Sequence, residues 1–178
     1  MVNEAIREAV GDEYPVWIKL GTAGAAFSGL TAEMGARYAA ACAEMGMGCV
    51  EISHAVGEME GLPKGEGTYM PMARVVRQVI AAEYPEDTPH EHPLALVKGF
   101  ATLAGMEAAL SEGVVQMISM CQPLIAEPDL PNKLMRGETQ KAACVRCRQC
   151  WPDDAQGTVM CRNAGVRRKL GLAPLAEA

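Results

Sequence analysis

Apolar positions along the chain follow two patterns, which predict strands and helices in turn. Near-continuous apolar runs predict buried strands, and they occupy residues 15–20, 49–53, 94–97 and 114–120. Apolar residues at helical spacing predict helices between those runs, at residues 3–10, 31–46, 72–84 and 102–113. The second helix carries a stripe made by Met34, Tyr38, Cys42 and Met45. Such alternation is typical of a parallel sheet covered by helices, so we predict an α/β fold.

Two segments are expected to be irregular. Residues 21–29 form a loop of small residues with three glycines, which is flexible enough to approach a ligand, and residues 123–133 are rich in proline. An open doubly wound sheet is one arrangement of four βα units, but the first strand is not followed by a glycine-rich phosphate turn. The other arrangement is half of an eight-unit barrel, which leaves two strand edges unpaired. Its expected inward side chains are mostly apolar, among them Val16, Ile18, Val50, Ile52, Leu96, Met117 and Ser119.

Cysteines are concentrated near the C-terminal end. Cys144, Cys147, Cys150 and Cys161 are four of the seven in the chain. Two successive Cys-x-x-Cys steps and a later fourth cysteine can bring four thiolates to one metal centre. The set suits a 4Fe-4S cluster, with a structural zinc site as the alternative and free thiols or a disulfide as the last interpretation. We expect the neighbouring Arg146, Arg148 and Arg162 to lower the thiolate pKa values.

Composition narrows the class of protein. The chain has 178 residues, of which 49% are hydrophobic and 21% charged, and its formal net charge is −6. This size suits one globular core, and the acidic balance argues against nucleic acid as a partner. No apolar run approaches the roughly 20 residues that span a bilayer, and residues 1–8 hold no apolar signal core. We therefore expect a cytoplasmic protein without a membrane partner, in which Cys42, Cys49 and Cys121 are buried free thiols.

Several segments together resemble the Old Yellow Enzyme family. They are Tyr14–Leu20 with Gly29-Leu-Thr31, Val50–Ser53, Pro123–Lys133 and the cysteine loop. The resemblance runs from Asn3 to about Asn163 and is nearest to the iron–sulfur branch that includes 2,4-dienoyl-CoA reductase and trimethylamine dehydrogenase. That family's catalytic domain is an eight-unit TIM barrel holding FMN, and this chain is similar only to its second half. The resemblance implies that residues 1–137 are the C-terminal half of a (β/α)8 barrel, and that residues 138–178 are a cysteine-rich iron–sulfur loop and tail.

The same resemblance implies a set of cofactor-binding residues. Lys19 matches the cation that the family places against the pyrimidine edge of the flavin. Gly99 matches the second of two glycines that hold the FMN phosphate through backbone N–H groups, and Lys98 stands in place of the first. Gln122 replaces the family's phosphate-clamping arginine, and Cys121 replaces the small residue before it. A lysine can serve a phosphate as a point charge, so Lys98 can compensate for the arginine missing at position 122.

The function implied is part of an FMN-dependent NAD(P)H:flavin oxidoreductase. It would pass electrons between a 4Fe-4S cluster and FMN and act on C=C or C–N bonds of a small-molecule substrate. The family's first half carries the residues that bind substrate, so a separate N-terminal half-barrel chain is the expected partner, with a homo-oligomer as the second choice. The alternatives are a non-catalytic iron–sulfur or zinc module and a truncated inactive paralogue. His54, which replaces a glycine of the family, is interpreted as a loop histidine without a role, with a new polar group near the flavin as the alternative.

Overall fold

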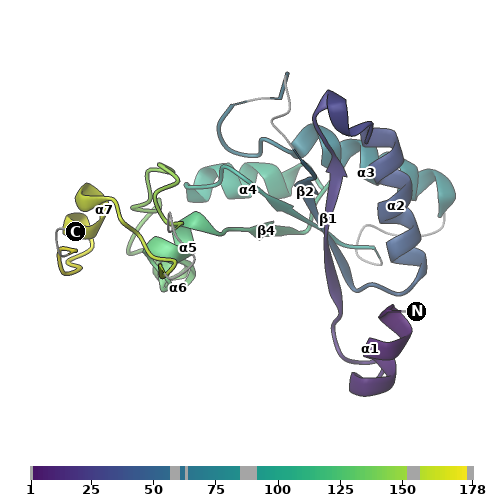
Figure 1. Ribbon diagram of the computed structural model, residues 1–178, viewed down its shortest axis with the longest axis horizontal. Helices are drawn as coiled ribbons and strands as arrows, with labels where there is room; N and C mark the ends of the chain where they lie inside the picture. Colours follow the sequence, from purple (N-terminus) through teal and green to yellow (C-terminus); the bar gives the residue numbers. More distant parts are fainter. Residues whose placement is uncertain (1, 57–60, 63, 85–91, 152–156, 176–178) are drawn as a thin grey trace.

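A computed structural model describes residues 2–56, 61–62, 64–84, 92–151 and 157–175. Within these ranges the strands form one four-stranded sheet, made of β1 (Trp17–Ala23), β2 (Cys49–His54), β3 (Leu94–Val97) and β4 (Met117–Ser119). The spatial order is β1-β2-β3-β4 and all neighbours are parallel. Parallel strands laid down in chain order, each joined to the next by a helix, confirm the predicted α/β fold (Figure 1).

One helix precedes the first strand, others connect the strands, and three follow the last strand among the described residues. The helices are α1 (Val2–Val10), α2 (Ala32–Glu44), α3 (Met70–Glu83), α4 (Leu103–Ser111), α5 (Gln122–Ala126), α6 (Leu130–Met135) and α7 (Ala164–Lys169), with a 3-10 turn at Ala26–Ser28. In Figure 1, α2 and α3 lie side by side on one side of the sheet, and α5 to α7 lie at the opposite end of the molecule. None of the described helices has the length and apolar character needed to cross a membrane.

Several boundaries differ from the sequence-based expectation. β1 continues through residues 21–23, so the small-residue loop begins later, and β4 is shorter than expected. The proline-rich segment is not irregular, because it forms α5 and α6. Each of these helices has its proline in the first turn, where the ring suits the helical backbone and the missing N–H costs no hydrogen bond. Proline there starts a helix instead of preventing one.

Helix α2 packs against the sheet through its smallest residues. Its buried positions include Gly35, Ala36, Ala39 and Ala40, whereas most of the predicted apolar stripe is exposed, with Tyr38 at 52%. The helix approaches β1 so closely that a Cβ at Gly35 would lie 1.8 Å from the carbonyl oxygen of Thr22. The predicted stripe was wrong because backbone proximity, not side-chain size, decides which face of α2 is buried.

The two faces of the sheet differ in chemistry. One face packs against the helices in the main apolar core, to which Ile18, Val50, Ile52, Leu94 and Leu96 belong. The expected inward positions were therefore largely wrong, since Ile18, Val50, Ile52 and Leu96 point to the helices.

The opposite face holds a polar bridge. Lys19, Glu51, Ala95 and Met117 are register partners and so share this face. Lys19 Nζ lies 2.6 Å from Glu51 Oε1, and the Ser119 hydroxyl donates to Glu51 Oε2 at 2.9 Å. The face that a closed barrel would turn inward is thus partly polar in this chain.

Candidate functional site

A cleft of about 920 Å³ opens at the carboxyl ends of the strands. Lys19 of β1, His54 of β2, Val97 of β3 and Ser119 of β4 all contribute to its wall. In parallel α/β folds the loops that follow the strands meet at this edge, and ligands bind there. The topology therefore places one shared cleft where the sequence predicts a cofactor.

The cleft is strongly basic although the chain as a whole is acidic. Its described lining includes Lys19, Lys64, Lys98, Arg146 and Arg148 and no aspartate or glutamate. The rings of Tyr69, Phe100 and Trp151 also line it. Cations focused in a concave site attract anions, and aromatic rings pack against planar groups. The lining suits a ligand that combines a planar ring with an anionic group.

All five predicted cofactor-binding residues line this cleft: Lys19, Lys98, Gly99, Cys121 and Gln122. The prediction that Cys121 is a buried thiol was wrong, because the residue is exposed, whereas Cys42 and Cys49 are buried as expected. Burial raises the pKa of Cys49 to about 11. Cys121 ends up exposed because it follows β4 at the rim of the sheet.

Lys98 and Gly99 form a turn that only unusual backbone angles allow. Their φ angles are +94° and +89°. A Cβ at Gly99 would lie 1.9 Å from the carbonyl oxygen of Gly65, so glycine is required there by space as well as by conformation. Lys98 has no such freedom, and a non-glycine residue at positive φ costs on the order of 1–3 kcal/mol. Strain of this kind concentrates at functional sites.

His54 and Tyr69 form a hydrogen-bonded pair in the cleft that the sequence interpretation missed. The Tyr69 hydroxyl lies 2.6 Å from His54 Nδ1, and Lys98 Nζ lies 5.6 Å from the centroid of the Tyr69 ring. Fifteen residues separate His54 from Tyr69. The only sequence signal was the histidine that stands where the family has glycine.

The cysteine loop approaches this cleft directly. Arg146 Nη1 donates to the carbonyl oxygen of Gly99 at 2.5 Å, and Arg146 and Arg148 both line the cleft. Both arginines have positive φ, at 57° and 64°. The backbone N–H of Arg146 also donates to Cys144 Sγ at 3.4 Å. One residue therefore contacts a predicted metal-ligating sulfur through its backbone and the cofactor cleft through its side chain.

The four cysteines of the loop are free thiols in the structure. Cys150 and Cys161 are buried, Cys144 is half-buried and Cys147 is exposed. Among the described residues, no group of three or more His, Cys, Asp or Glu side chains is arranged to hold a metal ion. The donor set has the chemistry of a thiolate centre, and an N–H already directed at one sulfur is of the kind that tunes such centres.

Electrostatics within the loop differ from the prediction. Burial raises the pKa of Cys144. The backbone N–H of Arg146 lowers that pKa, and the nearby thiols of Cys161 and Cys147 raise it further. Burial also raises the pKa of Cys150, and repulsion from the other three thiols of the set contributes. The arginines were expected to lower these pKa values, but burial and thiolate repulsion outweigh them.

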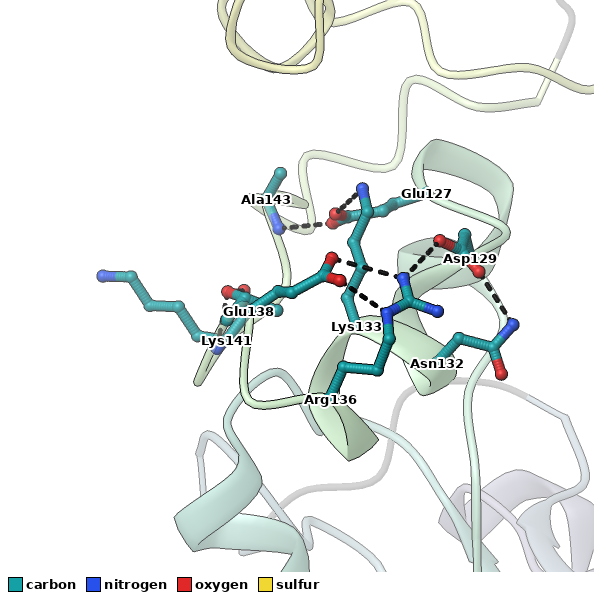
Figure 2. Close-up of polar contacts among 9 residues, drawn as sticks. Glu127, Asp129, Asn132, Lys133, Arg136, Glu138, Lys141 and Ala143 are labelled. Carbon is teal, nitrogen blue, oxygen red and sulfur yellow. Dashed lines mark hydrogen bonds and ion pairs between the residues drawn. The ribbon is translucent and has the colours of Figure 1, made fainter.

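A buried carboxylate anchors the start of the cysteine loop (Figure 2). Glu127, 8% exposed, pairs with Lys133 Nζ at 2.8 Å and accepts the backbone N–H of Ala143 at 3.2 Å. Ala143 immediately precedes the first cysteine of the set. The Pro123–Lys133 segment, singled out in the sequence, therefore provides the structural support on which the cysteine loop begins.

Four parallel βα units with a basic cleft at their carboxyl ends define a segment of a TIM-barrel-type α/β protein. Comparison with solved structures agrees. A 6-hydroxypseudooxynicotine amine oxidase (HisD) from Pseudomonas geniculata N1 superposes with a TM-score of 0.60 at 24% identity, over 76% of this chain and 19% of that one. The Old Yellow Enzyme homologue NCR from Zymomonas mobilis gives a TM-score of 0.54 at 19% identity, over 81% of this chain and 37% of that one. These likenesses show the shared fold.

Comparison of sequences adds one relative. A metal reductase from Desulforamulus reducens is 25% identical over 188 residues, which cover 99% of this chain and 26% of the reductase. No family model matches the chain. The chain spans about a quarter of the reductase and less than half of each superposed structure.

Proposed function

We propose that this chain is the cofactor-binding part of a flavin-dependent oxidoreductase, which holds FMN in the basic cleft and a 4Fe-4S cluster on Cys144, Cys147, Cys150 and Cys161. FMN would supply hydride and single-electron chemistry. The substrate would be a small molecule. The fold shared with an Old Yellow Enzyme homologue and an amine oxidase, and the sequence similarity to part of a metal reductase, support an oxidoreductase role.

The observation that carries the proposal is the contact between the cysteine loop and the cleft. Arg146 reaches from between two of the predicted ligands to the carbonyl oxygen of Gly99, at the proposed phosphate site. Electron transfer between two centres needs them to be close, and this contact puts the two binding elements side by side. A cysteine loop that only held a structural zinc ion would not need to place Arg146 and Arg148 in the cleft.

The cleft residues suit the phosphate of FMN despite the arginine missing at Gln122. Lys98, Arg146 and Arg148 line the cleft together with Gly99, whose lack of a side chain makes room for the carbonyl oxygen of Gly65. The sequence named Lys98 as the cation that compensates for the arginine missing at position 122. Arg146 and Arg148 add two more cations to the same cleft. Because three cations share the phosphate, removal of any one would weaken binding without abolishing it.

We further propose that the remainder of the barrel comes from other sequence, either a separate N-terminal half-barrel chain or a longer protein. Residues 1–137 would form the C-terminal half barrel, and residues 138–178 the cluster loop and tail. The support is the partial coverage of every compared protein and the unpaired outer strands β1 and β4 of the described sheet.

Anaerobic purification tests the proposal. We expect brown protein that contains iron, whose broad absorbance bleaches with dithionite, and that binds added FMN as judged by flavin fluorescence. Cys147→Ser should remove the iron absorbance, while Cys42→Ala, a buried thiol outside the loop, should retain it. Stoichiometric zinc without iron would favour the zinc module, and iron without FMN binding would favour a flavin-free electron-transfer module.

A further inference from the structure

The His54–Tyr69 pair joins the end of a strand to the start of a helix in the wall of the cleft. His54 is the last residue of β2, and Tyr69 immediately precedes α3. The Tyr69 side chain is buried, at 3% exposure, in the main apolar core, and its hydroxyl reaches His54 Nδ1 at 2.6 Å. A buried phenol hydroxyl needs a hydrogen-bond partner. The His54 imidazole is that partner, so the Tyr69 hydroxyl fixes the ring through one of its two nitrogens, Nδ1.

Charged groups from three other elements face this pair. They are Lys19 of β1, Lys98 after β3 and Arg148 of the cysteine loop. Burial, Lys98, Lys19 and Arg148 all lower the pKa of His54. Burial raises the pKa of Tyr69, and the charge of Arg148 opposes it. At neutral pH the pair is therefore an un-ionised phenol and a neutral imidazole. A phenol is the stronger proton donor of the two, so we expect the Tyr69 hydroxyl to donate and His54 Nδ1 to accept.

The direction of that hydrogen bond determines the tautomer of His54. A neutral imidazole carries its proton on one nitrogen and accepts on the other. Because Nδ1 accepts from Tyr69, the proton is on Nε2. His54 lines the cleft and is only half-buried, so Nε2–H is the polar group that it can offer to a ligand.

We propose that His54 is a ligand-contacting residue of the basic cleft that donates a hydrogen bond from Nε2 to the anionic part of the bound molecule, and that Tyr69 is the positioning residue that fixes this tautomer. The ligand class is a planar anion, in keeping with the cations and aromatic rings of the cleft. This deepens the proposed function if the ligand is FMN, but it requires only an anion. The proposal takes up the alternative interpretation of His54, a polar group near the flavin, in place of a loop histidine without a role.

A bound anion also changes the protonation of the pair. It offsets the charges of Lys19, Lys98 and Arg148, which disfavour the imidazolium in the free protein. His54 therefore becomes easier to protonate when the cleft is filled, and binding draws a proton from solvent onto Nδ1 once the Tyr69 hydroxyl turns to accept. Anion affinity should consequently rise as pH falls toward the pKa of His54.

The first test needs no ligand. ¹⁵N-histidine spectra of the folded chain should show His54 as the Nε2–H tautomer, its signal assigned by loss in His54→Asn. Tyr69→Phe keeps the ring and removes only the hydroxyl, so it should let the two tautomers mix and raise the pKa of His54. His92→Asn serves as the matched control, since the His92 ring packs at a tilt against Tyr84 and is not among the residues that line the cleft. An Nδ1–H tautomer in the wild type, or no change in Tyr69→Phe, overturns the positioning role.

The second test adds FMN and, separately, inorganic phosphate. Both should shift the His54 Nε2 signal and raise its pKa, and His54→Asn should weaken FMN binding about tenfold, the range of one charge-assisted hydrogen bond. If phosphate shifts the His54 Nε2 signal but FMN does not bind, the flavin proposal is wrong and the role of His54 as an anion contact is supported. A His54 signal unmoved by either probe overturns the inference even if FMN binds.

Discussion

Lys98 combines a backbone conformation that favours glycine with a charged side chain directed over the Tyr69 ring. Two substitutions separate these properties. Lys98→Gly removes both the strain and the charge, so we expect it to raise the free energy of unfolding by about 1 kcal/mol and to weaken FMN binding by roughly ten- to a hundredfold. Lys98→Ala removes only the charge. It should weaken binding equally without the gain in stability.

Chemical denaturation and flavin fluorescence measure the two effects. Lys141, which lines a different pocket, gives the matched control Lys141→Ala, for which FMN affinity should stay unchanged. Adding Gln122→Arg to Lys98→Ala should restore affinity, because arginine grips phosphate with two donors. Equal FMN affinity in wild type and Lys98→Ala would contradict the proposal that this lysine compensates for the arginine missing at position 122.

At the scale of elements, the cysteine loop depends on Glu127. Glu127→Ala removes both the ion pair to Lys133 and the acceptor for the Ala143 N–H. An unsatisfied buried N–H costs about 1–3 kcal/mol, so the loop should loosen and lose iron faster to a chelator. Glu138→Ala is the matched control, because Glu138 pairs with Arg136 at the exposed surface. Equal rates of iron loss in the two variants would contradict the anchoring role.

Helix α4 should lose stability in acid through Glu66. This carboxylate accepts hydrogen bonds from the N–H groups of Ala101 and Thr102 and from the Thr102 hydroxyl. Burial opposes ionisation, but these hydrogen bonds and the charge of Arg146 outweigh it, and the pKa of Glu66 lies below its ordinary value. The stabilisation is therefore present above the unfolded pKa and is lost as pH falls through the lowered folded pKa.

Glu66→Gln makes that dependence measurable. At pH 7 the variant should be less stable than the wild type by about 1–2 kcal/mol, because a neutral amide oxygen accepts weaker hydrogen bonds than a carboxylate does. The gap should narrow as pH falls through the lowered pKa of Glu66, because the wild-type carboxyl then becomes protonated. Melting curves across pH 3–7 give the comparison, and a gap independent of pH would show that ionisation of Glu66 does not contribute.

Sequence reasoning succeeded where local signals are strong. The helices predicted at residues 31–46 and 102–113 are present as α2 and α4. Each begins after a threonine whose side chain accepts a backbone N–H, Thr31 from Met34 and Thr102 from Gly105. It failed for the apolar stripe of α2, because tertiary contact with Thr22 selected the glycine and alanine face. No local pattern reports such an approach between distant segments.

The candidate site was predictable in part for the same reason. Lys98, Gly99, Cys121 and Gln122 follow strands, so topology alone brings them to one edge, and Lys19 reaches the same cleft from within β1. The Tyr69–His54 hydrogen bond and the reach of Arg146 to Gly99 depend on how loops fold over that edge. The roles of these residues and the metal of the cysteine loop remain predictions.

At the scale of the whole molecule, the open sheet edges predict association. β1 and β4 end the described sheet, and Trp17 on β1 is 54% exposed. Unpaired edges invite pairing with another strand. Light scattering after size exclusion should give a mass above that of the monomer for the chain alone, and a one-to-one complex with a complementary N-terminal half barrel. Trp17→Lys should reduce self-association, and a cooperatively melting wild-type monomer would contradict the prediction.

The Glu51 bridge has a consequence for how such a complex would form. The Glu51 carboxylate on β2 accepts a hydrogen bond from Ser119 on β4 across β3, where Ala95 is the register partner of Glu51 and Val97 that of Ser119. Strands two apart in a flat sheet stand about 9.6 Å from each other. Side chains that touch across that gap imply that the strands bend toward one another on this face. The sheet is thus already an arc with its concave side outlined by polar atoms, and an incoming half barrel would meet a preformed curvature.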